Sequence, residues 1–130
     1  MDDSTSQAAG RPVLQPGPDH PITVTPTGSR VLVKAGDQVV ADTTSALTLQ
    51  ESNYPAAQYV PLADVNPDLL RPSDTTSYCP YKGDCSYYSL ATKAGEITDA
   101  VWTYREPYAA VSEIAGHVAF YPGKVTITVS

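Results

Sequence analysis

Short runs of alternating hydrophobic and polar residues recur along the chain from residue 22 onward. A period of two is typical of β-strands that bury one face, and the β-branched and aromatic residues in these runs favour strands over helices. Glycine and aspartate separate the runs, as at Gly36-Asp37 and Gly95, which favours antiparallel neighbours joined by tight turns. We expect the last two runs to pair as a hairpin across Pro122-Gly123-Lys124. The predicted strands are residues 22–25, 30–34, 38–42, 46–51, 59–62, 84–91, 97–104, 117–121 and 125–129.

Two segments depart from this alternation and predict short helical connectors. Residues 63–70 offer Asp64 or Asn66 as the capping residue, and residues 108–114 follow Pro107. No repeat of fixed period is present in the sequence, which argues against solenoids and propellers. The sequence therefore predicts a mostly β fold, either a small antiparallel barrel or two packed sheets, because both arrangements hide strand edges.

The first 21 residues differ in composition from the rest of the chain. Residues 1–21 contain four prolines, two glycines and no hydrophobic period, so they cannot bury enough surface to offset the entropy of ordering. We expect a flexible N-terminal tail there, followed by a single β-domain over residues 22–130. With 42% hydrophobic residues in a chain of 130, one core of ordinary size is expected.

Fourteen acidic against eight basic side chains give the chain a formal net charge of −6. Such a chain is repelled by phosphate backbones and anionic lipid heads, which argues against nucleic-acid and membrane partners. No run approaches the ~20 apolar residues that span a bilayer, and the N-terminus lacks the pattern of a secretory signal, so a cytoplasmic location is expected. In that reducing compartment Cys79 and Cys85 stay thiols, whereas export would favour a disulfide between them. A monomer and a dimer fit the sequence equally well.

Residues 78–89 concentrate the reactive side chains, with four tyrosines, two cysteines and a lysine in twelve positions. A structural zinc ion needs about four close ligands, whereas Cys79 and Cys85 are six positions apart and only His20 and His117 add to them. No metal site is therefore expected, and Cys85 is interpreted as a small buried hydrophobe. Phosphate-loop and dinucleotide signatures are absent from the sequence, so no cofactor is expected either.

Lys82 has two interpretations. It is either a solvated turn lysine beside Gly83 or an anion contact that works together with backbone N–H groups around Gly83. Lys82 would also stabilise a Cys79 thiolate, and Cys79 would then serve as a nucleophile or redox thiol. In that enzyme, Asp64 or His117 would move the protons.

The aromatic residues of the second half also have two interpretations, since rings on alternating strands either build a core or wall a ligand pocket. Neighbours on a strand point to opposite faces, so only one of Tyr87 and Tyr88 can line a given pocket, whereas Trp102 and Tyr104 share a face. A pocket filled by Tyr87 or Trp102 would leave no room for a ligand. The rings concerned are Tyr78, Tyr81, Tyr87, Tyr88, Trp102 and Tyr104.

A series of short motifs spans most of the chain. In order, they are residues 40–43, Glu51, residues 59–65, residues 79–83, Tyr87-Tyr88, residues 102–104, Pro107 and residues 114–121. Over residues 28–130 this series resembles a bacterial family named domain of unknown function 427. The resemblance implies a compact β-domain similar to β-tent folds, which hold a small ligand or a zinc ion between two sheets. Members are sometimes labelled nucleotidyltransferase-like, although nothing in this chain resembles the paired metal-binding aspartates and glycine-serine loop of polymerase-type nucleotidyl transfer.

The resemblance also singles out individual side chains. Leu62 and Ala63 depart from the family pattern, which more often has an arginine followed by a small or acidic residue. If that arginine contacts a ligand, anion binding is weaker in this chain. Arg30 stands where the family tends to have a basic residue. The other implied positions are Asp42, Glu51, Tyr59, Asp64, Cys79, Lys82, Gly83, Trp102, Tyr104 and Pro107.

Three functions follow from these observations. The first is binding of a small molecule or modified group in an aromatic-walled pocket with Lys82 as anchor. The second is a thiol-dependent enzyme, which requires Cys79 in a cleft within reach of a base. The third is a structural or protein-interaction module whose rings only build the core. For the first function the expected ligand-binding residues are Arg30, Asp42, Glu51, Tyr59, Tyr81, Lys82, Gly83, Trp102 and Tyr104.

Overall fold

The computed structural model describes residues 11–130, and in them strands predominate. A larger sheet of seven antiparallel strands has the order β1-β4-β5-β9-β8-β7-β6, and a smaller sheet of three has the order β10-β2-β3. Of the two predicted arrangements, two sheets rather than a closed barrel is correct. The strands are β1 (Ile22–Pro26), β2 (Val31–Ala35), β3 (Gln38–Thr43), β4 (Leu47–Glu51), β5 (Ala57–Pro61), β6 (Leu70–Cys79), β7 (Gly83–Thr92), β8 (Gly95–Thr103), β9 (His117–Phe120) and β10 (Thr126–Val129).

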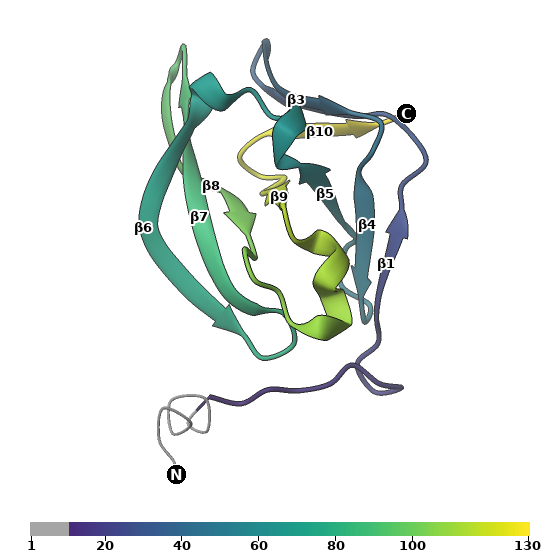
Figure 1. Ribbon diagram of the computed structural model, residues 1–130. Coiled ribbons are helices and arrows are strands. Elements are labelled where there is room, and N and C mark those ends of the chain that lie inside the picture. The colour runs from purple at the N-terminus through teal and green to yellow at the C-terminus, as the bar shows by residue number, and fades with distance from the viewer. Residues whose placement is uncertain (1–10) are drawn as a thin grey trace.

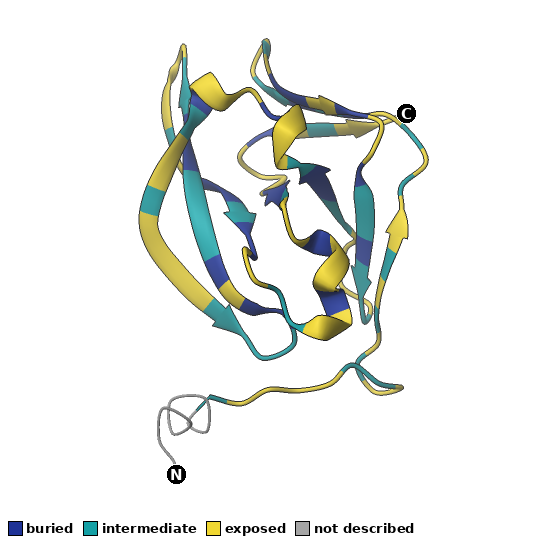
Figure 2. Cartoon of the chain, viewed as in Figure 1, coloured by how far each residue is buried: buried dark blue, intermediate teal, exposed yellow. Residues whose placement is uncertain are grey.

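The large sheet is strongly curved. In Figure 1 it runs from β1 and β4 on one side, through β9 in the middle, to β7 and β6 on the other side. One core cluster joins the two sheets, because it contains Val33 of β2 together with Val60 of β5 and Val101 of β8. A second cluster joins Leu49 of β4 to Cys85 of β7, two strands of the large sheet. Figure 2 shows buried segments on both sides of the curved sheet.

The predicted strands are present, but the predicted hairpin of residues 117–121 and 125–129 is wrong. β9 pairs with β5 and β8 in the large sheet, whereas β10 pairs with β2 in the small sheet. The turn between them carries the chain from one sheet to the other and buries Val125 on the way. A turn signal in the sequence shows that the chain reverses, not that the two strands hydrogen-bond to each other.

The ten-residue strand β6 has no counterpart in the sequence prediction. Its middle, from Arg71 to Ser77, is polar and mostly exposed, because β6 is an edge strand that pairs only with β7. The ladder to β7 is interrupted between Pro72 and Thr76. An edge strand exposed on both faces needs no alternation of hydrophobic residues, so the pattern that revealed the other strands is missing here.

Both predicted helical connectors are short 3-10 helices. Residues 63–70 contain η1 (Leu62–Asp64) and η2 (Pro67–Leu69), and the second connector is η3 (Ala109–Ile114). Of the two predicted caps, Asn66 caps η2 by accepting a hydrogen bond from the Asp68 N–H at 3.0 Å. None of the helices in residues 11–130 has the length and apolar character needed to cross a membrane.

The predicted flexible tail, residues 1–21, lies partly outside the described residues, which begin at Arg11. Residues 11–20 run along the turn between β6 and β7 and contact it. The Leu14 N–H donates to the Pro80 carbonyl at 3.0 Å, and the Tyr78 hydroxyl donates to the Pro12 carbonyl at 2.7 Å. These contacts bring the N-terminal segment beside the candidate site.

Candidate functional site

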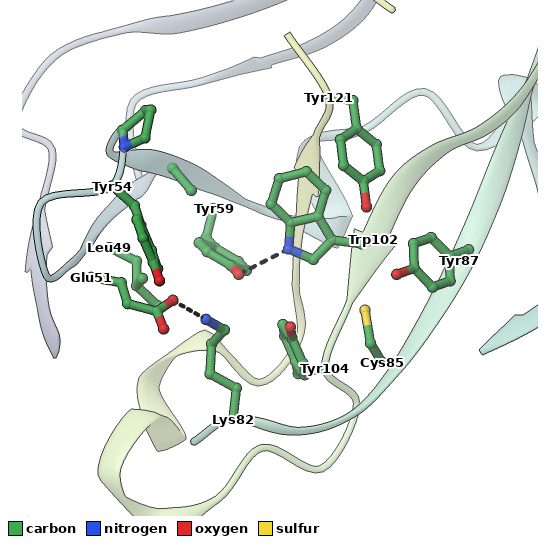
Figure 3. A pocket seen from close by; sticks show the side chains of 12 residues that line it. Leu49, Glu51, Tyr54, Tyr59, Lys82, Cys85, Tyr87, Trp102, Tyr104 and Tyr121 are labelled. Carbon is green, nitrogen blue, oxygen red and sulfur yellow. Dashed lines mark hydrogen bonds and ion pairs between the residues drawn. The ribbon is translucent and has the colours of Figure 1, made fainter. Parts of the chain in front are cut away.

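A cavity of about 250 Å³ is lined by residues of β4, β5, β7 and β8 (Figure 3). Ligand pockets in proteins typically measure about 300–1,000 Å³, so this cavity suits a molecule of one or two rings. Its two charged lining residues are Glu51, at the end of β4, and Lys82, in the β6–β7 turn. The aromatic lining residues are Tyr54, Tyr59, Tyr87, Trp102, Tyr104 and Tyr121.

Lys82 and Glu51 form an ion pair at one side of the cavity. Lys82 is only 8% exposed, and its Nζ donates to Glu51 Oε1. The other carboxylate oxygen, Oε2, lies 2.7 Å from Nε2 of His20. Burial by itself would raise the pKa of Glu51, but the hydrogen bonds from Lys82 and His20 outweigh it and hold that pKa below its ordinary value. Glu51 is therefore a carboxylate with both oxygens engaged.

The β6–β7 turn directs Lys82 inward. The Lys82 N–H donates to the Cys79 carbonyl at 3.2 Å, and the Lys82 carbonyl accepts from the Tyr108 N–H at 3.0 Å. Gly83 follows with a φ of +109°, in a region that other residues rarely adopt, and a Cβ at this position would lie 3.5 Å from the Glu106 carbonyl oxygen. Lys82 is thus buried and not solvated, and its backbone N–H is used within the turn.

Tyr59 and Trp102 form a hydrogen-bonded wall of the cavity. The Trp102 Nε1–H donates to the Tyr59 hydroxyl at 2.9 Å, and the two rings meet edge to face with centroids 6.2 Å apart. Burial raises the pKa of Tyr59, so its hydroxyl stays neutral. Tyr121 lies against the other side of Trp102, with centroids 4.5 Å apart, and burial with a contribution from Tyr87 raises the pKa of Tyr121 to about 12. The rings line the cavity without filling it.

In Figure 3, Tyr104 and Cys85 lie between Lys82 and Tyr87. Both are buried, and burial followed by the influence of Cys85 raises the pKa of Tyr104. Lys82 Nζ lies 5.9 Å from the centre of the Tyr104 ring. Tyr87 lines the cavity whereas Tyr88 packs against the core that joins the sheets, so the predicted split between these neighbours is confirmed.

Three predicted residues lie away from the cavity. Arg30 and Asp42 form an exposed pair on the small sheet, with two hydrogen bonds of 2.8 Å each. Asp64 accepts a hydrogen bond of 2.7 Å from the Thr43 hydroxyl. Each of these side chains therefore already has a hydrogen-bond partner outside the cavity. Of the predicted site residues, the cavity brings together Glu51, Tyr59, Lys82, Trp102 and Tyr104.

Cys79, the last residue of β6, and Tyr81, in the turn that follows it, do not line the cavity. The Tyr81 ring stacks on His20, with centroids 4.1 Å apart and planes 7° from parallel. Cys79 is half-buried and is a free thiol, as is Cys85. Within residues 11–130 no hydrogen bond joins the Cys79 thiol to a base. The Nδ1 atom of His117 lies 2.9 Å from the Ala115 carbonyl oxygen instead. The thiol-enzyme hypothesis gains no support from this geometry and stays a prediction.

Sequence reasoning missed several residues of the site, among them the lining residues Tyr54, Cys85 and Tyr121 and the Glu51 partner His20. His20 falls in the segment expected to be a tail, and no signal in the sequence relates it to Glu51, 31 positions away. Cys85 could have been found, because residues two apart on a strand share a face and Cys85 therefore accompanies Tyr87. In the part of the chain from Arg11 to Ser130, no group of three or more His, Cys, Asp or Glu side chains is arranged to hold a metal ion.

Comparison with models of known protein families shows which family the chain belongs to. A family model described as Domain of unknown function (DUF427) matches residues 23–130. The chain belongs to the DUF427 family. This match confirms the resemblance of residues 28–130 and extends it to all of β1 except Ile22. Comparison of this DUF427 member with curated proteins gave no match.

Proposed function

We propose that this DUF427 protein binds a small molecule in the cavity beside the Lys82–Glu51 ion pair. In this proposal Tyr59, Trp102 and Tyr104 are the walls, and Lys82 is the polar anchor. The ligand is of one or two rings, because the cavity measures about 250 Å³. No covalent chemistry is required of the site.

The buried ion pair at a ring-lined cavity is the observation that carries this proposal. Removing two charges from water is expensive, and apolar residues of similar size often serve stability as well or better. A lysine that is only 8% exposed beside a cavity is therefore more useful for recognition than for folding. The Trp102–Tyr59 hydrogen bond supports the same conclusion, because it fixes a flat apolar wall opposite the charges.

The test is a screen of one- and two-ring fragments for binding to the wild-type protein and to Lys82→Met. Trp102 is the single tryptophan of the chain, so its fluorescence reports directly on the cavity. We expect binders that raise the unfolding temperature and change Trp102 fluorescence. Loss of a hydrogen bond from a charged donor is worth about 1.5–3 kcal/mol, so Lys82→Met should weaken them about tenfold or more.

Lys93→Met is the matched control, since Lys93 is an exposed lysine in the turn between β7 and β8. It should bind the same fragments as the wild type. The proposal is wrong if no fragment of this size binds. It is also wrong if the binders leave Trp102 fluorescence unchanged and bind Lys82→Met as tightly as the wild type.

A further inference from the structure

We infer that the ligand of this cavity is an uncharged planar molecule that presents a hydrogen-bond acceptor to Lys82 Nζ. The Lys82–Glu51 pair, on this inference, excludes both carboxylates and ammonium ions. The inference rests on the proposed function and names the chemical class of its ligand. It follows from which charges and which donors of the site are already engaged.

The positive charge of Lys82 is already matched. Glu51 Oε1 accepts from Lys82 Nζ, and Glu51 Oε2 lies 2.7 Å from His20 Nε2. A ligand carboxylate would therefore meet a neutralised lysine and would stand close to the Glu51 carboxylate. Like charges at such short range repel, and the ligand would also lose its hydration on entering the cavity. The site does not offer an anion the net positive charge that would compensate these costs.

A cation is disfavoured for the opposite reason. Rings of tyrosine and tryptophan attract cations, and a carboxylate beside them normally strengthens that preference. Here the resident cation is Lys82 itself, with Nζ 5.9 Å from the centre of the Tyr104 ring. An entering ammonium group would be repelled by Lys82 and would find both oxygens of Glu51 engaged.

The remaining N–H donors of Lys82 Nζ favour a ligand that offers a hydrogen-bond acceptor. An ammonium group has three donors, and among residues 11–130 Lys82 Nζ has Glu51 as its hydrogen-bond partner and no other. The hydrogen bond to Glu51 uses one of these donors, which leaves two on a side chain that is only 8% exposed. Buried donors of this kind favour a ligand carbonyl or ring nitrogen, which supplies lone pairs without a charge.

Benzamide, benzoate and benzylammonium test the inference, because they share one ring and similar size but carry charges of zero, minus one and plus one. Binding to the wild-type protein is measured by calorimetry and by Trp102 fluorescence, with all three probes at the same mildly alkaline pH. We expect the affinity for benzamide to exceed that for either ion by about tenfold or more. Probes this small should have a Kd on the order of 1 mM, so ratios and not absolute affinities are compared.

Two variants should change the preference in opposite directions. Glu51→Gln leaves Lys82 without its counter-ion, so the affinity for benzoate should increase about tenfold relative to that for benzamide. Lys82→Met removes the resident ammonium group from the Glu51 carboxylate and the Tyr104 ring. The affinity for benzylammonium should therefore increase by a similar factor relative to that for benzamide. Circular dichroism and the fluorescence spectrum establish that each variant is folded. The wild-type ranking decides the question even if a variant fails to fold.

The outcomes separate this inference from the proposed function. If the wild type prefers benzoate or benzylammonium, the cavity binds small molecules but the inferred ligand class is wrong. Equal binding of all three probes overturns the inference in the same way. If none of the three binds and the fragment screen is also empty, the proposed function itself fails.

Discussion

Glu51 connects three parts of the chain that are distant in sequence. Its carboxylate lies at the end of β4, where it pairs with Lys82 of the β6–β7 turn and with His20 of the N-terminal segment. The side chain is 14% exposed, so both contacts are partly shielded from water. Because the pair holds the pKa of Glu51 below its ordinary value of 4.5, the carboxylate is more stable in the folded protein than in the unfolded chain.

This difference predicts how stability depends on pH. A carboxyl with a lowered pKa in the folded state contributes stability above its ordinary value of 4.5, and this contribution is lost as the pH falls through the folded pKa. Between about pH 5 and pH 3, the wild type should therefore lose more free energy of unfolding than Glu51→Gln, which has no carboxyl there. Urea denaturation of both proteins across this range measures the difference. Parallel curves would show that Glu51 has the same pKa in both states.

The sequence predicted the charged and aromatic side chains of the site better than their partners. Glu51, Lys82 and Trp102 were expected at the site from their motifs, and the cavity contains them. His20 could not be expected, because its contact with Glu51 depends on where a proline-rich segment lies in space. Arg30 was expected at the same site, but its contact is an exposed pair with Asp42. Motifs identify residue types, whereas the sheet topology decides which of them meet.

The N-terminal segment and the β6–β7 turn form one structural unit beside the cavity. Arg11 pairs with Asp84 and its guanidinium lies 3.9 Å from the centre of the Tyr78 ring. At the other end of the segment His20 stacks on Tyr81. A segment held at both ends restricts the turn that carries Lys82, so we expect the segment to support the inward position of that lysine.

Hydrogen exchange measures whether residues 11–20 are held in this way. The Leu14 N–H donates to the Pro80 carbonyl, whereas the neighbouring Val13 forms no backbone hydrogen bond with other described residues and is 49% exposed. We expect the Leu14 amide to exchange about tenfold or more slowly than the Val13 amide, each corrected for its intrinsic rate. Tyr81→Ala removes the stacking partner of His20 and should raise the Leu14 rate. Equal rates for Leu14 and Val13 in the wild type would support the flexible tail predicted from composition.

Elements with one buried face were predictable, and elements without one were not. β7 and β8 alternate in sequence, and both were predicted within two residues of their ends. β6 is an edge strand with few buried positions, so its polar sequence resembles a loop. The partners of β9 and β10 could not be predicted either, because strand pairing across two sheets depends on contacts between residues far apart in the chain.

The two sheets form one molecule because they share a core. The cluster that contains Val33 of the small sheet also contains Val60 and Val101 of the large sheet. β8 contributes Val101 to that cluster, while the next residue, Trp102, points to the opposite side and lines the cavity. Loss of the shared core should therefore destabilise the cavity at a distance, even though no residue of the small sheet lines it.

Val33→Ala tests this coupling. Val33 is fully buried, and removing two methyl groups from a core costs roughly 2 kcal/mol. We expect that loss in the free energy of unfolding, with Trp102 fluorescence and far-ultraviolet circular dichroism following one coincident urea transition. Val39→Ala is the matched control, since Val39 of the same sheet is 44% exposed and should change stability by less than about 0.5 kcal/mol. If circular dichroism changes before Trp102 fluorescence in Val33→Ala, the sheets unfold separately and the cavity depends on the large sheet alone.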